Sequence, residues 1–393
     1  MKNGAVTDEA GVAAAILAAG AAREPLLVQG RGTKLGMLRP VQAARTLSTR
    51  DLTGITLYSP QELIISARAG TTVPDLEAHL AERGQHLIAE PPDLSGLLGE
   101  GVPTIGGVVA SNLSGPRRVA WGAMRDHVMG VRAVNGTGET IRSGGRVLKN
   151  VTGLDLCKLL TGSHGTLAVI TEVTLKVLPA PELTGSLVLP AGNAAVAVRL
   201  LSAALGSPYS VSAAAYLPAD AAERVPELAG SGAVAVIRIE DFAKSVAYRL
   251  GRLADELGGE RLDDPASQRM WRAIRDAAPL RAEPGDAVWR VSVRPSNGPA
   301  ALQAVTEADG RGFLDWGGGL LWAAGPPAMH DAVVAAAKVG RGTWTLLRAP
   351  EGMRATLDVI PPEPAALARI TRRVKAAMDP HGILNPGRMY AGL

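Results

Sequence analysis

The chain has 393 residues, of which 47% are hydrophobic and 20% are charged, and its formal net charge is +4. Because a single hydrophobic core rarely grows beyond about 250 to 300 residues, this length predicts two or three globular domains. Cys157 is the only cysteine, which excludes an intrachain disulfide and an iron–sulfur cluster held by this chain alone.

Charge and hydropathy argue against two classes of partner. The basic residues are scattered and aromatic residues make up only 3% of the chain, whereas nucleic-acid binding needs clustered basic residues and stacking rings. The longest apolar run, residues 10–22, is 13 residues long, which is shorter than the roughly 18 needed to cross a bilayer. We therefore expect no nucleic-acid partner, no transmembrane segment and no signal peptide, and a cytoplasmic location.

The N-terminal part reads as helix, strand and loop, followed by strand and helix. Thr7 is a candidate cap for a helix with two acidic residues in its first turn, where they oppose the helix dipole. Residues 25–29 form a short apolar strand that runs into a glycine-rich loop. A second strand over residues 62–70 precedes a helix that is capped by Thr72 and ends at Gly84.

Later segments predict a hairpin over residues 128–144, with a turn at Gly136, and a half-buried strand before Pro179. From about residue 182 glycine clusters become rare, and apolar helices alternate with strands, which indicates a second α+β domain. An amphipathic helix precedes Asp379 and Pro380.

Three glycine-rich segments are candidates for binding chemistry. The first, residues 29–36 (QGRGTKLG), follows a strand directly, and successive glycines let backbone N–H groups approach an anion closely. A Rossmann turn would need a helix to follow, but Pro40 arrives too soon, and no P-loop motif is present. From these residues alone, a phosphate cradle and a plain strand-to-loop turn both remain open.

The second segment, residues 103–112 (PTIGGVVASN), has paired glycines between apolar residues. It predicts either a backbone that passes close to a flat or phosphorylated ligand, or a helix start packed tightly on a strand. The third, residues 161–171 (TGSHGTLAVIT), reads by itself as a turn before a strand.

In this order and spacing, the three segments resemble the PCMH-type FAD-binding domain of the vanillyl-alcohol oxidase superfamily, and residues 379–389 (DPHGILNPGRM) resemble its C-terminal return. The resemblance covers about residues 5–180 and 363–393. It implies an α+β fold: an FAD-binding domain of two α+β subdomains over residues 1–181, a cap domain with an antiparallel sheet over 182–362, and a C-terminal helix and loop over 363–393 that return to the FAD domain.

Within the superfamily, the stretches WGAMRDHVMGV, GGRVLKNVTGLDLCKLLTGSHGTLAVITEVTLKVLP and AVWRVSV look most like the FAD-binding subunits of bacterial glycolate oxidases, which are 2-hydroxy-acid dehydrogenase complexes. The resemblance implies FAD as cofactor, a second FAD-containing catalytic subunit and an iron–sulfur subunit as partners, a small 2-hydroxy acid as substrate, and contact with the inner membrane only through partners. The implied pyrophosphate-binding residues are Gly30, Arg31, Gly32, Thr33 and Lys34. The implied continuation of the FAD cradle is Thr104, Ile105, Gly106, Gly107 and Asn112. The residues implied to border the flavin are Gly162, Gly165, Val169, Ile170 and Asn385.

The sequence also departs from the family. Catalytic relatives carry an HxGDGNxH-type stretch, whereas LDWGGGLLWAAG, residues 314–325, contains no histidine, so metal-assisted activation of a hydroxyl group is not visible. Leu154 replaces the tyrosine of the family's NVxGYD motif, and Ala168 replaces the last glycine of GTLG. No Cys or His stands where covalent flavin attachment is expected.

The remaining histidines are widely spaced and predict no metal site, and we assign no catalytic residue. His164 is the exception to test, because an imidazole beside a flavin can tune its potential or carry a proton. The sequence leaves three functions open: an active dehydrogenase chain, a relay or structural FAD subunit of a complex, and a solitary flavoenzyme acting on another alcohol or hydroxy acid.

Overall fold

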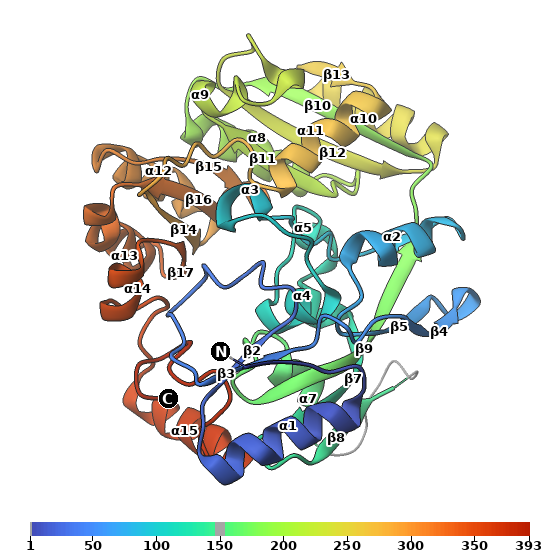
Figure 1. Cartoon of the computed structure of the whole chain (residues 1–393). Helices are drawn as coiled ribbons and strands as arrows, with labels where there is room; N and C mark the ends of the chain where they lie inside the picture. The colour runs from blue at the N-terminus through green and yellow to red at the C-terminus, as the bar shows by residue number, and fades with distance from the viewer. Residues whose placement is uncertain (1, 146–153) are drawn as a thin grey trace. The chain divides into compact units, whose positions relative to one another are not determined.

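The computed structural model describes residues 2–145 and 154–393, so part of the stretch that carries the family resemblance, residues 146–153, lies outside the described residues. The chain divides into two compact units, each with its own sheets (Figure 1). The first unit comprises residues 1–113, 123–180 and 362–393, and the second comprises residues 114–122 and 181–361. The segment 114–122, which the predicted division places in the first domain, therefore packs with the second unit. The predicted α+β fold class is confirmed.

The first unit begins with a small parallel sheet of strand order β1-β3-β2: β1 (Lys2–Ala5), β2 (Leu26–Gln29) and β3 (Arg45–Ser48). Helix α1 (Glu9–Ala22) packs on it, with Val12 and Ile16 buried in the same cluster as Leu26. The helix is capped by Asp8, whose side chain accepts a hydrogen bond from Gly11 N at 2.7 Å, so the prediction of Thr7 as the cap was wrong by one residue.

A larger antiparallel sheet completes this unit. Its order is β4-β5-β9-β7-β8, and β6 also pairs with β9. The strands are β4 (Ile55–Ser59), β5 (Ile64–Arg68), β6 (Gln85–Leu87), β7 (Val128–Asn135), β8 (Thr140–Gly144) and β9 (Ala168–Pro179). The helices are α2 (Val73–Ala81), α3 (Ser95–Leu98), α4 (Ile105–Ser111), α6 (Met124–His127) and α7 (Leu156–Leu160). The predicted β7–β8 hairpin and the Thr72 cap of α2 are confirmed.

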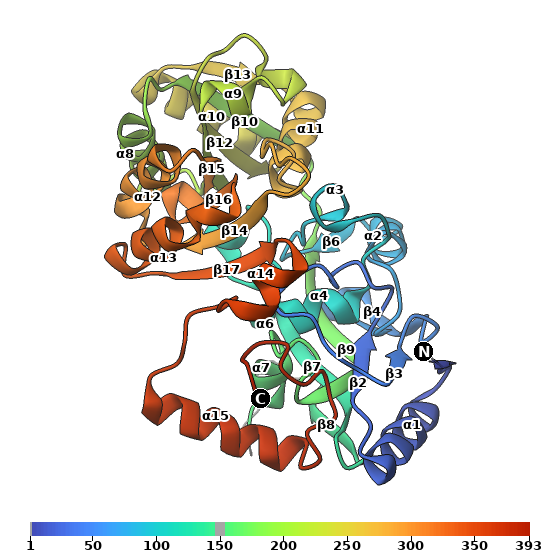
Figure 2. The same cartoon turned by 60° about the vertical axis from the view of Figure 1, so that its left-hand side comes forward.

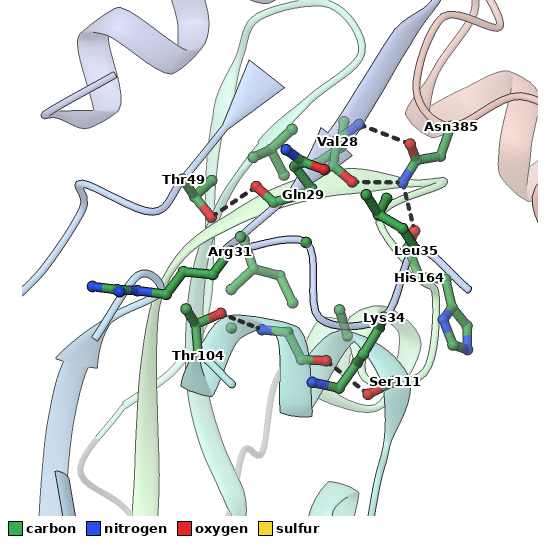
Figure 3. Close-up of a pocket in the computed structure, with 18 of the residues that line it drawn as sticks. Val28, Gln29, Arg31, Lys34, Leu35, Thr49, Thr104, Ser111, His164 and Asn385 are labelled. Carbon is green, nitrogen blue, oxygen red and sulfur yellow. Dashed lines mark hydrogen bonds between the residues drawn. The ribbon is translucent and has the colours of Figure 1, made fainter. Parts of the chain in front are cut away.

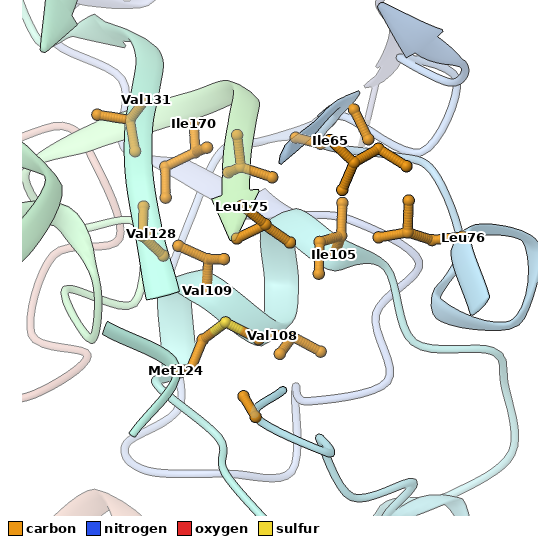
Figure 4. Packing of buried hydrophobic residues seen from close by; sticks show 14 of the residues in the cluster. Ile65, Leu76, Ile105, Val108, Val109, Met124, Val128, Val131, Ile170 and Leu175 are labelled. Carbon is orange, nitrogen blue, oxygen red and sulfur yellow. The ribbon is translucent and has the colours of Figure 1, made fainter. Parts of the chain in front are cut away.

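Helix α4 is held against this sheet by apolar side chains. Ile105, Val108 and Val109 are fully buried and share a hydrophobic cluster with Ile65 and Leu175 (Figure 4). Burial of this face fixes the position of α4, so that Gly106 lies against Ala69 and Gly107 lies toward Lys34 in the loop after β2.

The second unit is built on an eight-stranded antiparallel sheet of order β13-β10-β12-β11-β15-β16-β14-β17 (Figure 2). The strands are β10 (Leu183–Pro190), β11 (Ala213–Leu217), β12 (Val234–Asp241), β13 (Glu260–Leu262), β14 (Ala287–Ser292), β15 (Arg311–Asp315), β16 (Leu320–Gly325) and β17 (Thr343–Arg348). The helices are α5 (Arg118–Trp121), α8 (Ala194–Leu205), α9 (Ala219–Ala222), α10 (Ala243–Leu257), α11 (Asp264–Arg275), α12 (Gly298–Glu307), α13 (His330–Val339) and α14 (Glu351–Thr356).

The last helix, α15 (Ala365–Met378), belongs to the first unit but contributes little to its core. Leu367 and Ile370 remain 50% and 56% exposed, and Lys375 is the only buried residue of the helix. The helix is therefore anchored by a buried cation rather than by an apolar face.

Candidate cofactor site

A pocket in the first unit collects the glycine-rich segments that the sequence singles out (Figure 3). Its walls come from β2 and the following loop, from α4, from the start of β9 and from the C-terminal segment. Residues far apart in the sequence thus meet in one place. The predicted residues that line it are Gly30, Arg31, Gly32, Thr33, Lys34, Thr104, Gly106, Gly107, Gly165, Val169, Ile170 and Asn385.

Three predicted residues support the pocket from behind instead of lining it. Ile105, the first residue of α4, is fully buried in the hydrophobic core on which this helix packs. Asn112 ends α4 in a left-handed conformation, with φ of 49°, and its Oδ1 accepts a hydrogen bond from Arg125 N at 3.0 Å. A Cβ on Gly162 would lie 3.4 Å from the Asn112 Cβ, so Gly162 fits closely against that turn.

Close backbone approach brings the loop after β2 against the start of α4. A Cβ on Gly30 would lie 2.5 Å from Thr104 Oγ1, a distance that no real side chain tolerates. Thr104 in turn caps α4, because its Oγ1 accepts a hydrogen bond from Gly107 N at 3.3 Å. Gly30 is thus needed for this packing. A side chain on Gly107 would project toward Lys34, because the added Cβ would lie 3.7 Å from Lys34 Nζ.

The pocket is electropositive. Burial lowers the pKa of Lys34 to about 8, and the charge of the Asp93 carboxylate offsets only part of this effect. Burial, and then the charges of Arg388 and Lys34, lower the pKa of His164 to about 3, so this imidazole is neutral at physiological pH. Gln29 Oε1 is buried and accepts no hydrogen bond within the described part of the chain.

These features fit a dianionic pyrophosphate. A desolvated ammonium without a contacting carboxylate costs free energy that a bound anion removes, and lysine is a common phosphate ligand. Glycines on two facing segments leave room for the anion to approach the main chain. The residues present are therefore compatible with the FAD that the family resemblance implies.

The C-terminal segment holds the pocket together through Asn385. Its side-chain amide donates to the carbonyls of Val28 at 3.1 Å and His164 at 2.8 Å, and its Oδ1 accepts from Val28 N at 2.7 Å. One side chain thus connects β2 to the turn before β9 (Figure 3). Asn385 is consequently a positioning residue as well as a pocket residue.

Two further cations fix the same segment. The Arg388 guanidinium donates to the carbonyls of Lys34 at 2.6 Å, Leu35 at 3.3 Å and Arg39 at 2.9 Å, which shapes the loop after β2. The buried Lys375 ammonium donates to Thr166 O at 2.7 Å and Leu384 O at 3.0 Å and pairs with Asp379 at 2.7 Å.

Sequence reasoning missed several pocket residues. They are Leu27, Val28, Gln29, Leu35, Thr49, Ala110, Ser111, Ala168 and Arg388, together with His164, which it singled out for testing without placing it among the binding residues. Arg388 follows the family-like NPG directly, and Val28 precedes the first glycine loop, so both carried a positional signal. Within residues 2–145 and 154–393, no group of three or more His, Cys, Asp or Glu side chains is arranged to hold a metal ion.

Comparison with known proteins decides the family. A model of the FAD binding domain matches residues 5–144. The glycolate oxidase subunit GlcE of Escherichia coli K12 is 35% identical over 372 residues, which cover 94% of each chain. This chain belongs to the glycolate oxidase subunit GlcE family. It is therefore an FAD-dependent oxidoreductase of the glycolate oxidase type, and its cofactor is FAD.

Other similarities are more distant. The glycolate oxidase subunit GlcD of Bacillus subtilis is 33% identical over 161 residues, which cover 41% of this GlcE-family chain and 33% of GlcD. A solved structure of p-cresol methylhydroxylase shares the fold with a TM-score of 0.71 at 13% identity over 98% of this chain and 88% of the other. An alkyldihydroxyacetonephosphate synthase structure gives a TM-score of 0.68 at 17% identity, covering 98% of this chain and 76% of the other.

Proposed function

We propose that this GlcE-family chain holds FAD in the first unit with the pyrophosphate between the loop after β2 and the start of α4. The proposal rests on one observation above the others: Lys34 is desolvated, and no carboxylate contacts it within the described residues of the pocket. Gly30, Arg31, Gly32, Thr33 and Thr104 would surround the same anion, and Gly106 and Gly107 would admit it to the backbone.

The flavin ring would lie against the start of β9. Gly165, Val169 and Ile170 line the pocket here, with the Val169 and Ile170 side chains packed into two different hydrophobic clusters, and the buried Ala168 takes the place of a glycine without closing the pocket. His164 would present a neutral imidazole, which can donate or accept a hydrogen bond without adding charge. Asn385 would hold this wall in a fixed position relative to β2. Three residues outside the pocket would support the wall: Ile105, Asn112 and Gly162.

We further propose that the chain works as an electron-relay subunit of a 2-hydroxy-acid dehydrogenase complex. Bound FAD supplies a two-electron acceptor, and the protein provides its position, its charge environment and exclusion of water. Catalytic relatives carry histidines in the segment that corresponds to LDWGGGLLWAAG. In this chain the segment carries Trp316, just before β16, and Trp322, within β16. The expected partners are a second FAD subunit with the histidine motif and an iron–sulfur subunit.

The experiment is anaerobic reduction of the purified, FAD-loaded chain. We expect a yellow protein that glycolate or D-lactate reduces slowly, that dithionite reduces at once, and that glycolate reduces quickly when the histidine-motif subunit is added. Rapid bleaching by glycolate with the chain alone would show that it is itself the dehydrogenase. Fast turnover of some other alcohol by the isolated chain would favour the solitary flavoenzyme.

The proposed location of the chain in the cell follows from its proposed partners. No helix among the described residues is both long and apolar enough to cross a bilayer. We propose a cytoplasmic location with peripheral association with the inner membrane through the partner subunits. Fractionation of cells with and without the iron–sulfur partner tests it, since the chain should leave the membrane fraction when that partner is deleted.

A further inference from the structure

A second hollow in the first unit opens beside α15 and the C-terminal residues, which lie next to each other in Figure 2. Its volume is about 320 Å³, which is at the lower end of the range for binding pockets. Its walls come from α7, from the turn that follows α7, from α15 and from the end of the chain. The apolar side chains that line it are Leu159, Leu167, Ile370, Val374, Met389 and Leu393.

The apolar face of α15 next to this hollow is largely open. Leu367 and Ile370 are 50% and 56% exposed, and Val374 is half-buried. These three side chains follow one another at spacings of three and four residues, so they form one stripe along the helix. Within the described part of the chain, no other element covers Leu367 and Ile370.

Three arginines of the same helix have no acidic partner. Arg369, Arg372 and Arg373 are exposed, and none of them pairs with a carboxylate within the residues that the structure describes. The remaining residues, Met1 and 146–153 (RVLKNVTG), include no Asp or Glu that could supply one. Helix α15 therefore presents positive charge that no acidic side chain of this chain contacts.

The hollow itself holds an acidic side chain, but its carboxylate is already engaged. Among the described residues that line the hollow, only Glu363 carries a carboxylate. It accepts a hydrogen bond from Thr371 Oγ1 at 2.8 Å, and burial together with the charge of Glu363 raises the pKa of Tyr390 to about 12. Glu363 therefore does not balance the arginines.

Two of these arginines flank the hollow. Ile370, Val374 and Lys375 line it, so they mark the face of α15 that points toward it. Arg373 follows Ile370 by three residues and lies on one side of this face. Arg372 precedes Lys375 by three residues and lies on the other side. An acidic ligand in the hollow would therefore find a cation on each side.

We propose that this hollow and the open face of α15 dock an acidic amphipathic helix of a partner protein, with its apolar side chains in the hollow and its carboxylates beside Arg372 and Arg373. Helices pack together through side chains spaced three and four residues apart, which is the spacing of Leu367, Ile370 and Val374. An apolar surface with a charged rim is typical of a protein interface. A flat bilayer surface would leave the hollow empty, so the geometry favours a protein.

The position of this docking face connects it to the cofactor site. Thr166 and Leu167 line the hollow, whereas His164 and Gly165 of the same turn line the FAD pocket. Lys375 ties α15 to this turn, because its ammonium donates to Thr166 O at 2.7 Å. A helix docked on α15 would therefore contact the turn that also borders the proposed flavin position. The link to electron relay rests on the proposed function, whereas the docking does not.

The test is fluorescence anisotropy of the purified, FAD-loaded chain with a fluorescein-labelled peptide of about 20 residues, a length that can form a helix. The peptide carries leucine along one helical face and glutamate on both sides of that face. We expect saturable binding that weakens as the salt concentration rises, because the ion pairs at the rim are exposed to solvent. A peptide of the same composition with scattered leucines should bind at least about tenfold more weakly, because it cannot bury an apolar stripe.

Substitutions locate the binding face. Ile370→Ser should weaken peptide binding at least about tenfold, because the interface no longer buries an isoleucine. Arg373→Gln should weaken it about two- to fivefold and reduce its salt dependence, as expected for one exposed ion pair. The matched controls are Leu17→Ser, at 57% exposure on α1 of the same unit, and Arg83→Gln, an exposed arginine after α2. Both should bind as the wild type does, and all four variants should keep their FAD content and melting temperature.

Assembly with the proposed partner subunits provides an independent readout. The chain in complex with the histidine-motif subunit and the iron–sulfur subunit should no longer bind the peptide, because a partner occupies the face. Unchanged peptide binding by that complex would overturn the proposal, as would equal binding of the scattered peptide or of Ile370→Ser. Binding to phosphatidylglycerol vesicles in place of the peptide, lost in Ile370→Ser, would overturn it in favour of a membrane. Specific peptide binding by a chain that forms no complex with these subunits would support the docking face and contradict the proposed function.

Discussion

Lys34 gives the pocket a pH dependence whose direction follows from its lowered pKa. Above about pH 8 the empty site loses its ammonium charge, so FAD binding must be accompanied by proton uptake. FAD affinity should then fall by up to about tenfold per pH unit above this value. Fluorescence titration with FAD from pH 6 to about pH 10 measures it.

Two variants separate this effect from general alkaline instability. Lys34→Met should bind FAD weakly at every pH and lose the pH dependence, whereas Lys244→Met, an exposed lysine of the second unit, should behave as the wild type. The unfolded chain holds more protons than the FAD-free native chain between about pH 8 and 10.5, so Lys34 makes stability without FAD increase with pH across that window. An FAD affinity that stays level up to pH 10 would contradict the role of Lys34.

The adjacent glycines of α4 should give opposite results when substituted. A Cβ on Gly106 would lie 2.6 Å from the Ala69 Cβ and 2.8 Å from Ala69 O, so Gly106→Ala should lower unfolding free energy by about 1 to 3 kcal/mol. A Cβ on Gly107 would lie 3.2 Å from Thr104 Oγ1 and 3.7 Å from Lys34 Nζ, and Leu favours helix over Gly, so Gly107→Leu should lower the unfolding free energy less than Gly106→Ala does and should abolish FAD retention. Differential scanning fluorimetry and the ratio of flavin to protein absorbance measure both. Full flavin content in Gly107→Leu would refute a close backbone approach there.

At the scale of elements, Asn385 joins β2 to the turn before β9. Asn385→Ala leaves Val28 N, Val28 O and His164 O without their side-chain partner, and it should cost on the order of 2 to 4 kcal/mol of unfolding free energy together with most of the bound FAD. Chemical denaturation and the flavin content after gel filtration measure the two losses. The control Asn193→Ala removes the cap of α8 in the second unit and should cost about 1 kcal/mol with FAD retained.

Local sequence patterns predicted where helices and strands lie better than they predicted which residues of those elements face the pocket. Alternation and glycine spacing located β2, the β7–β8 hairpin and the cap of α2, because those signals arise within a few residues. The family resemblance predicted that the glycine segments converge. Neither could separate Gly107, which faces the pocket, from Ile105, which faces the core, since that depends on how α4 packs on the sheet.

Long-range polar contacts were the least predictable feature. Arg388 shapes the loop after β2 by bonding carbonyls more than 340 positions earlier in the chain, with separations of 349 to 354. Lys375 is one of several basic residues on a surface helix by its sequence, yet it is buried and bonds the carbonyls of Thr166 and Leu384, which both lie outside the helix. Periodicity reports which face of a helix is apolar and cannot reveal a cation that anchors that helix from inside.

At the scale of the molecule, the path of the chain makes the FAD pocket dependent on its last residues. The first unit is assembled from three segments, and the last of them, residues 362–393, supplies Lys375, Asn385 and Arg388. The second unit is assembled from residues 114–122 and 181–361, so none of its segments lies beyond residue 361. Loss of the C-terminal segment should therefore affect the two units unequally.

Truncation after residue 361 tests this directly. The shortened chain should lose FAD and the early part of its thermal transition, because the carbonyls bound by Lys375 and Arg388 and the contacts of Asn385 are left unpaired in the first unit. The second unit keeps its whole sheet and should retain its own transition in calorimetry. Added FAD should raise only the first unit's transition in the intact chain and neither transition in the truncated one, since ligand binding stabilises the structure that binds it. A truncated chain that retains FAD would show that the glycine segments form the pocket without the C-terminal contacts.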